Sequence, residues 1–356
     1  MAGEHAWICG VGMVTPVGGQ TAQTAASVRA GISTYEESAI YNKRFEPMTM
    51  ALIPDDILPP LEDKLAGKSK LTSRQARMLQ LAHLALTEVM ESLPEGHQSP
   101  LPLVLVGPEP MPGRDQVIDG GFLRQLEAQS GIDFDNRLSK LCTTGRAGGV
   151  QALEVAMQLL ASGEHDFVLL GGVDSYLDLF LLATLDSEDR VLANGVMDGF
   201  APGEGAAFLL LCSDQARSAL PKKPTVKIHT PGYAMERGHR YSKDTYTGSG
   251  LADAVTAALK ALNNDPVATI LSSMNGENFG AKEWGVAFMR NSSALDPALR
   301  FEHPAECFGD VGAASLPILA GLAATGLKQG YFNGPAMICC SSEGPQRGAV
   351  CMTAET

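Results

Sequence analysis

The sequence has little positive charge, no long apolar run and no paired cysteine spacing. Its 356 residues include 27 Lys+Arg against 40 Asp+Glu, a formal net charge of −13. A general nucleic-acid binder needs a basic face for phosphate contacts, so this charge argues against that class. No apolar run approaches the roughly 18 residues that a membrane-spanning helix needs. No basic segment precedes the first apolar stretch, as it would in a signal peptide. We therefore expect neither a nucleic-acid partner nor a membrane span.

The cysteines and histidines also lack the spacings of known sites. Seven cysteines, an odd number, form no CxxC pair, and the seven histidines are scattered along the chain. Neither set follows the spacing of metal ligands, so we predict no metal and no cofactor. Unpaired cysteines favour a reduced, cytoplasmic protein. With 45% apolar and 19% charged residues, the chain can bury a large core, which argues against global disorder.

Predicted strands alternate with predicted helices, which indicates an α/β fold. Residues 73–92 carry apolar side chains at helical spacing, and Ser73 is a candidate helix cap. Short apolar runs at Leu103–Val106 and Phe167–Leu170 have no polar alternation. Such runs are typical of strands that are covered on both faces.

The order of helix, glycine and strands occurs twice along the chain. It is found in residues 148–212 and again in residues 312–353. The similarity lies in the pattern of elements and not in residue identities, and it suggests a duplication. We predict related halves at 1–212 and 225–356, joined by an exposed connector at 213–224.

Cys142 lies between a predicted strand and a glycine-rich helix start at Gly145–Gly149. Unpaired backbone N–H groups and the helix dipole favour a thiolate at a helix start. The same amides can stabilise an oxyanion. A free cysteine is also a common small hydrophobe in protein cores. From position alone, catalysis and simple burial both remain open.

Several segments resemble the β-ketoacyl synthases of the thiolase superfamily, in the order in which that family has them. They are Ile8-Cys-Gly-Val-Gly-Met-Val-Thr-Pro-Val-Gly18, the helix Arg74–Met90, Cys142-Thr-Thr-Gly-Arg-Ala147, Phe167-Val-Leu-Leu-Gly-Gly-Val-Asp174 and Asp198-Gly-Phe-Ala-Pro-Gly-Glu-Gly-Ala206. The resemblance implies a thiolase-like five-layer αβαβα fold with two duplicated halves, and a homodimer. It also implies fatty-acid or polyketide-type metabolism, with an acyl carrier protein or acyl-CoA delivering an acyl group to Cys142 as a thioester.

The sequence departs from this family at two places. The family uses two histidines to assist decarboxylation of a malonyl extender and to stabilise the enolate. Here Asn275 follows the strand that normally leads to the first histidine, and Gly309 stands in place of the second. An asparagine can donate a hydrogen bond but cannot exchange a proton, and a glycine has no side chain. We therefore expect no ordinary decarboxylative condensation.

Three residues near these places are candidates for the missing function. Glu277 and Asp310 flank the substituted positions, where burial would raise the pKa of a carboxyl group. Both can equally act as helix caps or ion-pair partners. His303 lies six positions before Gly309, although a loop histidine is more often solvated. The predicted catalytic group is Cys142, Asn275, Glu277, Asp310 and His303.

Other residues are predicted to contact substrate or partner. Phe200, Gly309 and Ser342 lie on segments that correspond to the family's pocket, and Glu204 is expected to brace nearby turns. One basic stretch is either a docking patch for an acidic carrier protein or a solvated helix face. It comprises Lys64, Lys68, Lys70, Arg74 and Arg77.

Two functions follow from these observations. In the first, the protein is a ketosynthase-like acyltransferase that carries an acyl thioester on Cys142. In the second, it is a non-catalytic thiolase-fold subunit that binds an acyl chain or a partner condensing enzyme. The cysteine favours the first, and the loss of both histidines favours the second.

Overall fold

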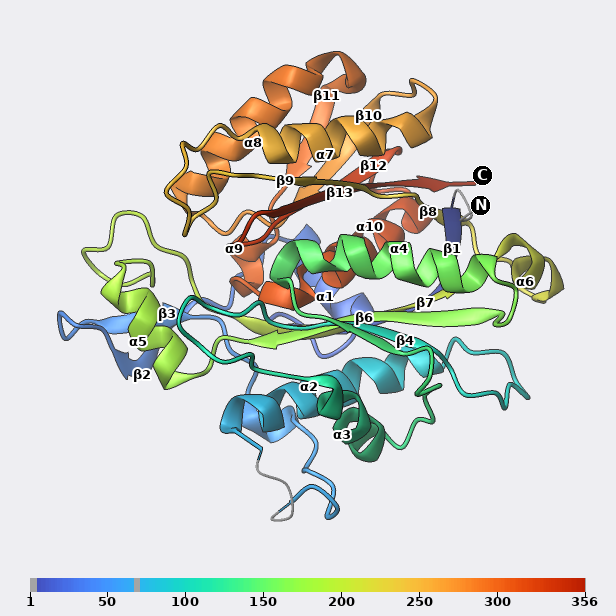
Figure 1. Cartoon of the computed structure of the whole chain (residues 1–356), viewed down its shortest axis with the longest axis horizontal. Helices are drawn as coiled ribbons and strands as arrows, with labels where there is room; N and C mark the ends of the chain where they lie inside the picture. Colours follow the sequence, from blue (N-terminus) through green and yellow to red (C-terminus); the bar gives the residue numbers. More distant parts are fainter. Residues whose placement is uncertain (1–4, 67–70, 356) are drawn as a thin grey trace.

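The computed structural model describes residues 5–66 and 71–355, and it has five layers in the order helix, sheet, helix, sheet, helix (Figure 1). One outer layer contains α7 (Ser249–Leu259) and α8 (Asn278–Asn291), and the other contains α2 (Ser73–Met90) and α3 (Gly120–Ser130). The middle layer contains α4 (Gly148–Ala161), α10 (Ser315–Gln329) and α1 (Thr21–Arg29). The predicted five-layer αβαβα arrangement is confirmed.

The two sheets repeat one topology. The first consists of β1 (His5–Val14), β4 (Leu103–Val106), β5 (Lys140–Cys142), β6 (Phe167–Ser175) and β7 (Glu204–Cys212). The second consists of β8 (Val226–His229), β9 (Gly232–Met235), β10 (Val267–Ser272), β11 (Leu295–Glu302), β12 (Ala336–Ser341) and β13 (Gln346–Ala354). The order β1-β7-β6-β4-β5 matches β9-β13-β12-β10-β11, and the parallel and antiparallel pairings agree at every step. β8 pairs with both β1 and β13 and so joins the two sheets edge to edge. The repeated topology supports the duplication, while the proposed boundaries of the halves stay a prediction.

The middle helices are apolar because both of their faces are covered. Nearly every residue of α10 is buried, and α4 exposes only one polar stripe that includes Glu154 and Gln158. One large apolar cluster surrounds these helices between the sheets, and separate clusters lie beneath α2 and α7. The core therefore holds the start of α4 rigidly between the two halves.

Local details differ from the sequence-based expectation. Thr72, and not Ser73, caps α2, in a capping box with Gln75. The expected connector contains the short helix α6 (Asp214–Ala219). A lobe formed by the hairpin β2 (Glu36–Tyr41) and β3 (Pro47–Met50) with α5 (Leu179–Ser187) was not foreseen (Figure 1). In the part of the chain that the structure describes, no helix is long and apolar enough to cross a membrane.

Candidate functional site

An arginine, Arg146, lies in the turn that leads into α4. β5 ends at Cys142, and one 3-10 turn, Gly145–Ala147, follows before α4 begins at Gly148. Gly145 has φ +67°, a left-handed conformation that suits glycine and delays the helix by several residues. Cys142 therefore lies between a strand and the glycine-rich helix start, as expected, and Arg146 lies in the turn that begins the helix, at 5% exposure. Burial raises the pKa of the Cys142 thiol, opposite to the thiolate that was expected.

Arg146 is held by buried partners from the C-terminal half. Its Nε donates to Asp310 Oδ1 at 3.1 Å, and its Nη2 makes a second bond to the same carboxylate. Nη1 donates to Glu343 at 3.0 Å, and Nη2 also donates to the Tyr176 hydroxyl at 3.3 Å. Burial alone would lower the pKa of Arg146, but the carboxylates outweigh burial and raise it well above its usual value. Arg146 therefore remains a cation that is fixed in place.

Asn275, Glu277 and Asp310 come together as predicted, but they converge on arginines. Asn275 Nδ2 donates to Asp310 at 2.8 Å and to Glu277 at 3.1 Å. Arg190 binds both oxygens of Glu277, at 2.7 and 2.8 Å. Their hydrogen bonds thus go to Arg146, to Arg190 and to one another, rather than to Cys142. The carboxylates of Glu277 and Asp310 therefore have the geometry of ion-pair partners, which is one of the alternatives that the sequence left open.

Glu343 joins the two groups of ion pairs. Arg190 Nη2 lies 2.9 Å from its Oε1, and Arg240 Nε lies 3.4 Å from its Oε2. Burial by itself would raise the pKa of Glu343, but Arg146, Arg190 and Arg240 together lower it to about 2. Three arginines and three carboxylates thus form one buried network, which we call the arginine network: Arg146, Arg190, Arg240, Glu277, Asp310 and Glu343.

The remaining predicted site residues have structural surroundings. The His303 side chain is 42% exposed and faces Glu306, so it lies outside the arginine network. Phe200 is 1% exposed and packs edge-on against Tyr176, so it does not line the cavity as expected. The predicted catalytic role of His303 and the predicted substrate contact of Phe200 are therefore corrected.

Gly309 and Ser342 brace the backbone. Gly309 has φ +73°, and a Cβ there would lie 2.7 Å from the Ala201 carbonyl oxygen, so a side chain is excluded at this point. The Ser342 hydroxyl accepts from the Ala147 N–H at 3.0 Å and donates to the Thr144 carbonyl. Ser342 therefore fixes the turn that carries Arg146 and is not directed at a substrate.

The basic stretch is not a free docking patch. Arg74 is paired with Asp174 at 2.8 Å, and Arg77 is paired with Glu204 at 2.6 Å. Both arginines are largely buried, so neither is available to an acidic carrier protein. Lys68 and Lys70 lie outside the described residues. Glu204 braces this region as expected.

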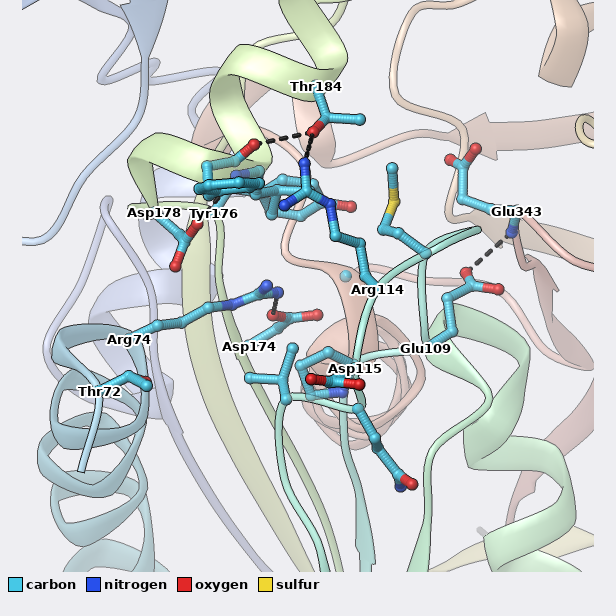
Figure 2. A pocket seen from close by; sticks show the side chains of 18 of the residues that line it. Thr72, Arg74, Glu109, Arg114, Asp115, Asp174, Tyr176, Asp178, Thr184 and Glu343 are labelled. Carbon is cyan, nitrogen blue, oxygen red and sulfur yellow. Dashed lines mark hydrogen bonds and ion pairs between the residues drawn. The ribbon is translucent and has the colours of Figure 1, made fainter. Parts of the chain in front are cut away.

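A cavity of about 500 Å³ lies beside Arg146 (Figure 2). The loop 108–117 and α5 form its walls, and Arg114 reaches across to Thr184 on α5 at 2.7 Å. A second cavity of only about 40 Å³ lies near Asn275. Arg146 and Glu343 line both cavities, so this ion pair forms part of the wall between them. Within residues 5–66 and 71–355, no group of His, Cys, Asp and Glu is arranged to hold a metal ion.

The sequence interpretation missed Arg146 and Glu109. Arg146 is the one charged residue in the glycine-rich helix start, but the family resemblance points to the cysteine four positions earlier. Glu109, whose carboxylate accepts the Glu343 and Gly344 backbone N–H groups at 2.8 and 3.0 Å, lies in no recognised sequence motif.

Comparison with known proteins agrees with this fold. Residues 139–217 match the family described as "Beta-ketoacyl synthase, N-terminal domain". A putative polyketide beta-ketoacyl synthase 1 from Streptomyces virginiae is 27% identical over 139 residues, which is 36% of this chain and a third (33%) of that protein's length. Among solved structures, the ishigamide ketosynthase/chain length factor matches with a TM-score of 0.78 and 16% identity, covering 99% of this chain and 100% of that one. A ketosynthase in complex with its chain length factor from Xenorhabdus doucetiae matches with a TM-score of 0.78 and 16% identity, covering 99% and 98%.

These similarities agree with the five sequence segments quoted above and with the repeated topology. They also place the most specific sequence match, residues 139–217, on the segment that carries Cys142 and Arg146. The chain thus has the fold of the ketosynthases, and its residues 139–217 match the N-terminal domain of the β-ketoacyl synthases.

Proposed function

We propose that this protein is a non-catalytic thiolase-fold subunit that pairs with a condensing enzyme of the β-ketoacyl synthase type. The observation that carries the proposal is Arg146, four residues after Cys142, which fills the turn before α4 with an ion-paired guanidinium. A guanidinium stays protonated in proteins and offers no nucleophile. Arg146 is also held by Asp310 and Glu343, so it cannot move aside without leaving Asp310 without a cationic partner.

The groups around Arg146 are also unsuited to proton transfer. A general base needs unpaired capacity to accept a proton at neutral pH. The Glu277 carboxylate is occupied by Arg190 and Arg240, and that of Asp310 by Arg146 and Asn275. The small volume of the cavity near Asn275 leaves no room for a substrate group there.

The similar proteins suggest the kind of partner. Two of the structural relatives are a ketosynthase/chain length factor and a ketosynthase in complex with its chain length factor. Another is a type II acyl-carrier protein in complex with its ketosynthase bound to the hexaketide. By analogy, this chain would pair with a ketosynthase that works on carrier-bound polyketide or fatty acyl chains. Its 500 Å³ cavity would contribute to the space in which the chain is held.

A second candidate is acyl transfer through Cys142, with the protein as a homodimer. The observation in its favour is that Cys142 is only partly buried. Its raised pKa and its place on a strand argue for the first candidate.

Intact-protein mass spectrometry separates the two candidates. The purified chain is incubated with acyl-CoA and with acyl carrier protein charged with the same acyl group, and we expect no acyl adduct. Cys9 is the other partly exposed thiol and provides a matched control. An adduct that persists in Cys9→Ala and disappears in Cys142→Ala would refute the non-catalytic proposal. Size-exclusion chromatography with light scattering then tests pairing with a type II ketosynthase from the same organism, for which a mixed dimer is expected.

A further inference from the structure

The Tyr176 hydroxyl lines the large cavity with a hydrogen that no described residue accepts. Its oxygen accepts a hydrogen bond from Arg146 Nη2 at 3.3 Å, so the hydroxyl hydrogen is left for another acceptor. Tyr176 is 9% exposed, and its ring packs edge-on against Phe200 with the ring centres 5.5 Å apart. The hydroxyl is therefore a fixed donor in the cavity wall.

Tyr176 also keeps its proton at neutral pH. Burial raises the pKa of Tyr176, and Asp310, Asp174 and Glu343 raise it further, against the lowering effect of Arg146. The hydrogen bond from Arg146 polarises the hydroxyl oxygen, which strengthens the O–H group as a donor.

Arg74 adds a second unused donor to the same cavity. Its side chain is 9% exposed, and its Nη2 donates to Asp174 at 2.8 Å. Its Nε is buried and has no hydrogen-bond partner in the part of the chain that the structure describes. Figure 2 shows Arg74 directed along the cavity toward Asp174. An unpaired buried donor costs free energy that an acceptor on a ligand can recover.

Three carboxylates of the cavity wall are already occupied by protein groups. Asp174 accepts two backbone N–H groups in addition to Arg74. Glu109 accepts two backbone N–H groups, and Glu343 is paired with arginines. Tyr176 and Arg74 therefore call for acceptors that these carboxylates do not supply.

The unpaired charges of the wall decide what kind of acceptor fits. Asp115 and Asp178 line the cavity, and neither forms an ion pair with a described residue. Arg114 is the one lining cation that forms none within the described chain, and it lies over the ring of Phe180. The unpaired charge of the wall is thus negative, which disfavours a carboxylate or a phosphate group on the ligand. Neutral carbonyl oxygens avoid this repulsion.

We propose that the cavity selects an acyl chain with keto groups, whose carbonyl oxygens accept from Tyr176 and Arg74, over a saturated chain of the same length. Met111, Val117 and Leu181 give the methylene groups an apolar wall. A saturated chain would contact this wall but leave both donors unpaired. The inference rests on the proposed function for the presence of an acyl chain, and it adds the chemical class of that chain.

Isothermal titration calorimetry at pH 6.5 tests the preference with two uncharged probes that differ only in keto groups. They are the N-(2-acetamidoethyl) amides of octanoic acid and of 3,5-dioxooctanoic acid. An amide does not acylate Cys142, so the titration reports binding alone. For the intact wild-type chain we expect a dissociation constant at least about tenfold lower for the dioxo amide. Tyr176→Phe should weaken binding of the dioxo amide at least about fivefold and leave binding of the octanoyl amide unchanged.

Tyr241→Phe is the matched control. The Tyr241 hydroxyl also accepts from an arginine of the network, Arg190 Nη1 at 3.3 Å, but Tyr241 lines neither of the two cavities beside Arg146. This variant should bind both amides like wild type. Equal dissociation constants in wild type would overturn the keto preference, as would tighter binding of the octanoyl amide or no binding of the dioxo amide. An unchanged preference in Tyr176→Phe would overturn the role of Tyr176. If that variant does not fold, the wild-type comparison alone decides.

The result is separable from the test of the proposed function. A mixed dimer with a ketosynthase, together with equal binding of the two amides, would refute only the keto preference. A keto preference without a mixed dimer would refute only the pairing.

Discussion

Replacing Arg146 by methionine removes the one cation that the described residues place within 4 Å of Asp310. Glu343 would keep Arg190 and Arg240, whereas Asp310 would keep only neutral donors, from Asn275 and the Gly312 amide. Removing one partner of a buried ion pair typically costs about 3–5 kcal/mol, because a charge is left buried without compensation. We therefore expect Arg146→Met to lower the free energy of unfolding by about 3–5 kcal/mol at pH 7.5.

Urea denaturation followed by circular dichroism measures this loss, with an unchanged slope as the sign that the same structure unfolds. The double variant Arg146→Met/Asp310→Asn should recover most of the stability, since it removes both charges. Arg137→Met is the matched control: this side chain is 81% exposed and 3.9 Å from Asp135, so its loss should be under about 0.5 kcal/mol. A cost below about 1 kcal/mol for Arg146→Met at pH 7.5 would refute the reasoning.

Three further predictions concern the same region. Gly145→Ala should lower the free energy of unfolding by at least about 2 kcal/mol, and the control Gly31→Ala by about 1 kcal/mol. Both glycines have positive φ, but only at Gly145 would the added Cβ contact Glu109. Urea denaturation measures both changes, and equal changes would contradict the close contact between Gly145 and Glu109. At pH 7.5, Cys142 should react with iodoacetamide at least tenfold more slowly in the native protein than in urea, because burial raises the pKa of its thiol. Peptide mass spectrometry measures the two rates. Rapid labelling of the native protein would contradict the burial of Cys142. Between pH 4.5 and pH 7, the free energy of unfolding of wild type should fall by up to about 3 kcal/mol relative to that of Glu109→Gln. The reason is that the carboxyl group of Glu109 binds its proton more tightly in the native protein than in the unfolded chain. Parallel pH profiles of the two proteins would contradict the raised pKa.

The architecture was predictable because its signals are strong and local. An uninterrupted apolar run marked β4 at its observed bounds. Helical spacing located α2, and glycines marked the turns that precede α4 and α10. The β2–β3 hairpin was missed because its strands are short and largely exposed, and α5 because its apolar residues are not spaced to mark one helix face. The lobe that they form is stabilised by contacts between distant segments, which periodicity does not report.

The site was predicted only in part, for a similar reason. The convergence of Asn275, Glu277 and Asp310 followed from the fold that the resemblance implied. Their role did not, because it depends on Arg146 and Arg190, which approach from the other half of the chain. The position of Cys142 before the helix was predicted, but the raised pKa of its thiol was not, because sequence spacing does not reveal how deeply the end of β5 is buried.

The arginine network makes the two halves chemically unequal. Arg146 and Arg190 come from the first half, and the carboxylates that hold them, Glu277, Asp310 and Glu343, come from the second. A symmetric pair of identical halves would place like charges against each other at this junction. Residues 1–212 thus contribute two cations to the network and residues 225–356 contribute three carboxylates and Arg240, so a pair of identical halves would leave this charge unmatched. A first half expressed alone would expose cations that only the second half can satisfy, and the two separate fragments should therefore reassemble with each other and not as homodimers.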